Sequence, residues 1–232
     1  MIIELRSGDK KAVVDTRGGY LTNYADEQGD IIYPKRTITD AAGELKTRGG
    51  CHVCMPNFGP GGTSGLDQHG YGRSSDWEII ETSDKHVVFG LEGQGNYSDM
   101  PARLRYDVSD SELKIALILT NNGEQMLEVG PAFHPYFATG DHLVIDGEAA
   151  DANAYNPVIF SAEVPEKVVN THGRTLLLKS ADMPYWAQWS DRLADYFCIE
   201  PSYGGFTFVT DNHYRTDLLQ PGTAKTYTFT IS

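Results

Sequence analysis

The chain has 232 residues, 40% of them hydrophobic and 22% charged, which is ordinary for a globular protein with a sizeable core. Its formal net charge of −13 argues against nonspecific nucleic-acid binding and against docking on anionic membranes. No apolar run approaches the roughly 18 residues of a membrane span, and Glu4 and Arg6 interrupt any signal-peptide core. Because the three cysteines come without a secretion signal, we expect reduced thiols and a cytoplasmic location.

Apolar and polar residues alternate with a period of two along most of the chain, and this pattern predicts β-strands. Turn signals such as Asn121-Asn122-Gly123 separate the runs. So many strands with short turns predict an all-β fold, a large antiparallel β-sandwich formed by one domain over residues 1–232. In chain order, the predicted strands cover 2–6, 11–14, 19–25, 30–33, 77–82, 86–92, 103–108, 112–120, 128–137, 142–146, 174–179, 195–200, 206–210 and 225–232.

Three segments depart from this pattern. A single helical turn is predicted after Pro165, over 166–169. The stretch 56–76 reads as one long irregular loop, and such loops in compact domains are often functional. A second loop region is predicted over 180–194.

Two motifs resemble binding sites, one for zinc and one for phosphate, but neither has the full set of residues that such a site needs. Cys51-His52-Val53-Cys54 resembles half of a zinc site, but zinc needs about four ligands, and the third cysteine, Cys198, is far away in sequence. Residues three apart on a strand also point to opposite faces, which favours buried thiols over a metal site. The glycines of 59–62 lack the lysine and the helix of a phosphate-binding loop.

His134 and Glu200 are the candidate acid and base. His134 lies between Phe133 and Pro135, and a strand with proline on both sides of the histidine, at 131 and 135, must be an edge, a bulge or a strand end. Glu200 ends an apolar strand, where it is either a solvated terminus or a partly buried base whose pKa apolar neighbours raise.

Arg48, His69 and Arg73 flank the long loop. Surface arginines are usually just solvated, but two of them with a histidine near one loop can instead clamp a hydroxyl-rich or anionic ligand.

Taken in order, these pieces resemble the aldose 1-epimerase (mutarotase) superfamily along nearly the whole chain. The segments at 18–22 and 29–33 resemble the family's opening strand pair, and 48–50 with 56–59 resembles its "RGG…P-x-FG" segment. His69-Gly70-Tyr71-Gly72-Arg73 with Trp77 resembles "HGFAR…W", and 133–137 resembles "H-x-YF". Residues 186–189 and 198–201 resemble "WNPW" and "C-x-EP".

The resemblance implies the family's β-supersandwich and mutarotation of a hexose without cofactor or metal. Glu200 matches the family's base, which takes the proton of the anomeric hydroxyl, and His134 matches the acid, which protonates the ring oxygen. His69 would hydrogen-bond the sugar. The partner implied is a small sugar or sugar phosphate, with no nucleic acid and no membrane, for a monomer or a homodimer.

Phosphate recognition is one open alternative. Arg48 and Arg73 match positions that bind phosphate in the hexose-6-phosphate 1-epimerase branch, and two guanidinium groups suit a phosphate dianion. The chain departs from the family where Ala187 and Gln188 replace the asparagine and proline of "WNPW".

Two further alternatives belong to other classes. A carbohydrate-binding or regulatory domain would keep the fold without turnover, although such a protein has no need of both His134 and Glu200. A glycoside hydrolase or lyase would usually need a second carboxylate beside the bond, and the sequence nominates none.

Overall fold

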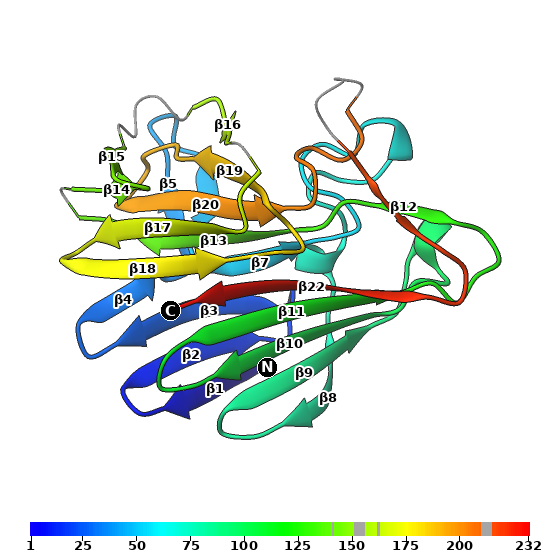
Figure 1. Ribbon diagram of the computed structural model, residues 1–232, viewed down its shortest axis with the longest axis horizontal. Helices are drawn as coiled ribbons and strands as arrows, with labels where there is room; N and C mark the ends of the chain where they lie inside the picture. The colour runs from blue at the N-terminus through cyan, green and yellow to red at the C-terminus, as the bar shows by residue number, and fades with distance from the viewer. Residues whose placement is uncertain (141, 151–155, 162, 210–214) are drawn as a thin grey trace.

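The computed structural model describes residues 1–140, 142–150, 156–161, 163–209 and 215–232. Within them, two large antiparallel sheets face each other across a shared core (Figure 1). The fold class is therefore the predicted all-β sandwich. None of the described helices is long or apolar enough to cross a membrane.

The first sheet holds strands from both halves of the chain. In spatial order it contains β1 (Ile2–Ser7), β2 (Lys10–Asp15), β3 (Tyr20–Asp26), β4 (Gly29–Ile32), β13 (Ala132–Ala138), β20 (Tyr196–Ser202), β19 (Tyr185–Trp189) and β16 (Ile159–Phe160), while β7 (Cys51–Cys54) pairs with β13 and β3.

The second sheet lies across the core from the first. In spatial order it contains β15 (Glu148–Ala149), β14 (Val144–Ile145), β17 (Glu166–Thr171), β18 (Arg174–Lys179), β22 (Ala224–Ile231), β11 (Leu113–Thr120), β10 (Ala102–Val108), β9 (His86–Leu91) and β8 (Glu78–Thr82).

Shorter elements connect the sheets. They are the ribbons β5 (Arg36–Thr39) with β6 (Leu45–Arg48) and β12 (Leu127–Val129) with β21 (Asp217–Leu219), and the 3₁₀ turns η1 (Gly62–Ser64), η2 (Gly72–Ser74) and η3 (Gly95–Tyr97).

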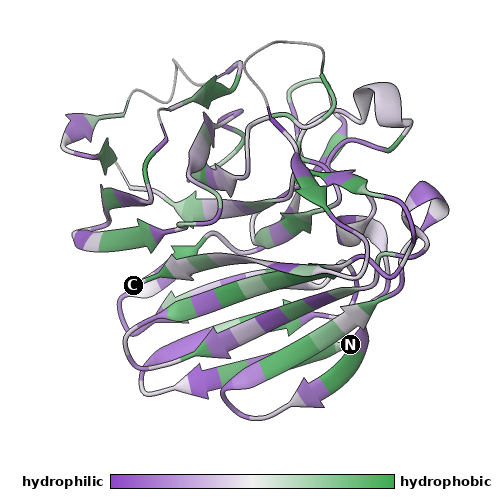
Figure 2. Cartoon of the chain, turned by 45° about the vertical axis from the view of Figure 1, so that its right-hand side comes forward, coloured by the Kyte–Doolittle hydropathy of each residue, from purple (hydrophilic) through white to green (hydrophobic). Residues whose placement is uncertain are grey.

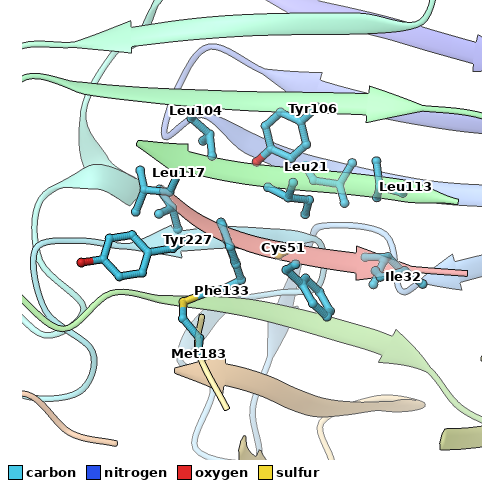
Figure 3. Close-up of a cluster of buried hydrophobic side chains, with 14 of the residues drawn as sticks. Leu21, Ile32, Cys51, Leu104, Tyr106, Leu113, Leu117, Phe133, Met183 and Tyr227 are labelled. Carbon is cyan, nitrogen blue, oxygen red and sulfur yellow. The ribbon is translucent and has the colours of Figure 1, made fainter. Parts of the chain in front are cut away.

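Side-chain alternation builds the core between the sheets. Leu21, Cys51 and Phe133 point inward from the first sheet and meet Leu104 and Tyr227 from the second (Figure 3). Burying a side chain of this size stabilises the fold by roughly 1.5–3 kcal/mol before entropy losses. The strands of the second sheet alternate between hydrophilic and hydrophobic residues, as expected for a sheet with one solvated face (Figure 2).

Some sequence predictions were wrong. The helical turn over 166–169 is part of β17, which pairs with β18 throughout and buries Lys167, whose ammonium group lies 2.6 Å from Asp146. The loop predicted over 180–194 contains β19. The strand predicted over 206–210 is absent from 206–209, and Thr210 lies outside the described residues.

Candidate active site

The strands β13 and β20 each divide their side chains between the core and a pocket on the opposite face. Phe133 and Phe197 pack into the core, whereas His134 and Glu200 face the pocket. The two strands are neighbours in the first sheet, so residues 66 apart in the sequence share one pocket floor. Because successive side chains of a strand point to opposite faces of the sheet, one strand contributes both to the core and to the pocket.

His134 and Glu200 are in direct contact. The His134 Nε2 atom lies 3.3 Å from Glu200 Oε2, and only 8% and 2% of the two side chains are exposed. Burial raises the pKa of Glu200 well above its ordinary value. Burial, together with the charges of His69 and Arg73, lowers the pKa of His134 well below its ordinary value. The pair therefore favours uncharged forms of both groups.

Flat rings hold the His134 imidazole from both sides. His52 stacks on it with 4.6 Å between ring centroids and an interplanar angle of 24°. Tyr136 stacks nearly parallel on His134 at 4.9 Å. The His52 Nδ1 atom lies 3.1 Å from the Tyr20 hydroxyl, which fixes the outer ring. The stack of Tyr136, His134 and His52 sets the plane in which the proposed acid works.

His52 was not nominated as a site residue from the sequence. Its only visible signal was the motif Cys51-His52-Val53-Cys54, which pointed to zinc. In the structure Cys51 belongs to the main core and Cys54 to a separate cluster on the other face, as strand geometry predicts. His52 lies directly opposite His134 in the pairing of β7 with β13.

His69 is neutral, and both of its ring nitrogens face a hydrogen-bonding group. Its Nδ1 atom accepts a hydrogen bond from the Gly59 N–H at 3.2 Å, so the neutral ring carries its proton on Nε2. Burial and then the Arg73 charge lower the His69 pKa to about 3. The ring meets His134 edge-on, with centroids 5.3 Å apart. The Nε2 atom lies 3.3 Å from the side-chain amide nitrogen of Gln68, which also lines the pocket.

The two arginines differ in their partners. Arg48 forms an ion pair with Asp191, with 2.7 Å between Nη2 and Oδ2, and lies over the Trp189 ring. Arg73 donates a hydrogen bond from Nη2 to the Gln68 carbonyl at 2.9 Å. Sequence reasoning did not identify Asp191, because it is 143 residues from Arg48.

All five nominated residues line one pocket of about 490 Å³. Sequence reasoning missed most of the remaining wall. The lining residues are Arg48, Phe58, Gln68, His69, Arg73, His134, Tyr136, Asn156, Pro157, Val158, Trp189, Glu200 and Phe206. A larger hollow of about 650 Å³ lies over β8–β11, but its charged residues, such as Glu78 and Arg103, are exposed. The smaller pocket is therefore the candidate site, because buried titratable groups converge there.

A metal is not required to explain the described residues. His134, Cys198 and Glu200 bring possible ligand atoms within 4.8 Å of one another. Burial raises the pKa of the Cys198 thiol and of the Glu200 carboxyl well above their ordinary values, which keeps both protonated. Protonated thiols and carboxyls are poor ligands, so a metal-free site stays the prediction.

The family model for aldose 1-epimerase matches residues 1–183. The chain belongs to the aldose 1-epimerase family. The match includes His134 and ends before Glu200. A comparison with curated proteins gave no significant match.

Solved structures share the fold of this aldose 1-epimerase family member over its whole length. A galactose mutarotase related enzyme from Lactobacillus acidophilus superposes with a TM-score of 0.83 at 14% identity, covering 100% of this chain and 97% of its own. A galactose mutarotase-like protein from Lactobacillus casei gives 0.80 at 15% identity, covering 100% and 99%. A Synechocystis protein gives 0.80 at 19% identity, covering 100% and 95%. These TM-scores show a common mutarotase-like sandwich.

The residue at the position of the family's "WNPW" asparagine lies beside Glu200. Ala187, which replaces the asparagine, lies directly opposite Glu200 in the pairing of β19 with β20. Among the described residues, Glu200 Oε2 has no hydrogen-bond partner. A buried carboxyl without a donor keeps its raised pKa.

Proposed function

We propose that this protein is an aldose 1-epimerase, which interconverts the α and β anomers of a hexose by acid/base ring opening. Glu200 takes the proton of the anomeric hydroxyl, and His134 protonates the ring oxygen. The observation that carries this proposal is the 3.3 Å contact between His134 Nε2 and Glu200 Oε2 on the floor of the pocket. An acid and a base at one hemiacetal are what the reaction needs.

The pair works with one proton shared between its two members. Before ring opening, Glu200 is ionised and His134 is protonated. As the bond between C1 and the ring oxygen breaks, the proton of the anomeric hydroxyl moves to Glu200, and the His134 proton moves to the ring oxygen. Rotation about the C1–C2 bond then exposes the other face of the aldehyde, and ring closure returns both protons.

The buried environment suits this cycle. Burial favours protonated Glu200 and neutral His134, which is the arrangement that follows ring opening. The arrangement needed before ring opening, ionised Glu200 with protonated His134, differs from the uncharged pair only in the position of one proton between the two side chains, which lie 3.3 Å apart. Only protons are redistributed, so the proposal calls for no cofactor.

Exchange between glucose or galactose anomers, followed by polarimetry or NMR, tests the proposal. His134→Asn and Glu200→Gln should each lower the catalysed rate by about a hundredfold or more, the usual scale for a lost acid or base. The exposed residues His142 and Glu166 provide matched controls, as His142→Asn and Glu166→Gln. A purified protein that does not exceed the buffer rate on free or phosphorylated aldoses would remove the enzymatic interpretation.

A sugar-binding protein without turnover is the alternative from another class. Calorimetric binding of a hexose without anomer exchange would favour it. The cytoplasmic location, the single domain and the monomeric or dimeric state stay predictions.

A further inference from the structure

We infer that Asp191 makes the pocket selective for uncharged aldoses over their phosphate esters. This inference rests on the proposed function and names its substrate class. It concerns the alternative in which Arg48 and Arg73 together bind phosphate.

One of the two edges by which Arg48 can bind an anion with two hydrogen bonds is already occupied. Arg48 Nε donates to Asp191 Oδ2 at 2.7 Å, and Nη2 lies 2.7 Å from the same oxygen. The third nitrogen, Nη1, donates to the Thr47 carbonyl at 2.8 Å. Asp191 therefore takes the edge formed by Nε and Nη2, and one N–H remains on each of Nη1 and Nη2.

Asp191 is itself held in place. It lies in the turn between β19 and β20, and its Oδ1 accepts hydrogen bonds from the Tyr196 hydroxyl and from the Leu193 N–H. Only 15% of its side chain is exposed, against 20% for Arg48. Moving the carboxylate aside for a phosphate would break these contacts as well as the ion pair.

The charge of the pocket leads to the same conclusion. Asp191 cancels the charge of Arg48, which leaves Arg73 as the one cation lining the pocket without an ionic partner among the described residues. A phosphate monoester carries nearly two negative charges at pH 7. It would meet one net positive charge instead of two, because the fixed Asp191 carboxylate offsets the charge of Arg48.

The test compares glucose with glucose 6-phosphate in two assays, anomer exchange and calorimetric binding. For the natural protein, we expect kcat/KM and affinity to favour glucose by about tenfold or more. Asp191→Asn should shift both ratios toward the phosphate by about tenfold, because it removes the negative charge and frees the Arg48 edge. Asp195→Asn makes the same change at an exposed position four residues away and should leave both ratios unchanged.

The outcomes separate this inference from the proposed function. Anomer exchange with an equal or greater preference for glucose 6-phosphate, or an unchanged ratio in folded Asp191→Asn, overturns the inference and leaves the function standing. Absence of exchange together with the expected shift in binding supports the inference and removes the function. Thermal unfolding confirms that each variant is folded, and the charge-retaining Asp191→Glu should keep the preference for glucose.

Discussion

At the scale of single residues, the surroundings of His134 matter as much as its identity. His52 stacks on its outer face and has no described partner at Nε2, although only 3% of the residue is exposed. Leaving a buried polar atom unpaired is costly, so the position invites a functional explanation. We interpret His52 as a positioning residue that keeps the imidazole of His134 facing Glu200.

A pair of variants tests this interpretation. His52→Ala removes the stacked ring and should lower kcat about tenfold with little change in KM, since misplacement of a catalytic group lowers the rate. His52→Phe restores a flat ring and should recover most of kcat. If both variants lose kcat equally, stacking is not what His52 provides. Thermal unfolding of both variants separates loss of positioning from loss of fold.

The pH dependence of exchange follows from the directions of the pKa shifts. Catalysis needs a single proton on the pair, so activity falls when His134 takes a second proton in acid or when Glu200 loses its proton in base. Because the His134 pKa lies below its ordinary 6.5, the acid limb should lie below pH 6.5. The rate above buffer, expressed as kcat/KM, should therefore be nearly the same at about pH 6.5 and about pH 7.5. An acid limb centred at or above pH 6.5 would contradict this expectation.

At the scale of elements, the glycines at 49 and 50 form the turn that joins β6, which ends at Arg48, to β7. Gly50 has φ +74, and a Cβ there would lie 2.5 Å from the Leu21 carbonyl oxygen. Because the Leu21 carbonyl belongs to β3, it cannot move away from such a Cβ without disturbing that strand.

Gly50→Ala should therefore destabilise the fold by about 3 kcal/mol, through left-handed strain of about 1–2 kcal/mol together with the clash. Gly43 is the matched control: it has φ +85, and a Cβ added there would have no neighbour within 4 Å, so Gly43→Ala should cost only the strain. Denaturant unfolding measures both. Equal losses would mean that the turn has room to relax.

The same scale shows what the sequence can and cannot predict. Strands with one solvated face, such as β11 and β22, alternate clearly and were predicted almost to the residue. The strands β7 and β19 are buried or nearly so on both faces, so alternation carries no signal there. β17 resembled a helical turn because a buried lysine interrupts its apolar face. The same limit applies to the candidate site. His134 and Glu200 lie in motifs that the sequence shows directly. Asp191 and His52 reach the site through contacts between segments far apart in the sequence, so the sequence did not indicate them.

At the scale of the whole molecule, several titratable groups are buried together, and this links stability to pH. Burial lowers the pKa values of His52, His69 and His134, and it raises that of Glu200. Each histidine contributes stability that is present above pH 6.5 and is lost as the pH falls, because the unfolded chain takes up the proton first. Glu200 acts in the opposite direction, since the folded state holds its proton more tightly.

Below about pH 6.5, the three histidines leave the unfolded state with more protons than the folded state, and Glu200 offsets part of this difference, so the free energy of unfolding should fall as the pH falls. Urea unfolding at about pH 7.5 and about pH 5.5 measures this. His52→Phe removes one of these histidines and should make the free energy of unfolding less dependent on pH. A free energy of unfolding that does not change between the two pH values would show that the histidines titrate normally.

The alternation of side chains in β13 and β20 also limits where residues can be inserted or deleted in this protein. Phe197 and Ile199 face the core, while Cys198 and Glu200 lie on the opposite face of the sheet. Inserting or deleting one residue within β20 would therefore exchange the two sets and put a carboxyl among the apolar side chains of the core. Natural insertions and deletions should therefore accumulate in the turn at 40–44, which is exposed except for Asp40, and spare the interiors of these two strands. A library of single-codon deletions would show the same boundary between tolerant turns and intolerant strands.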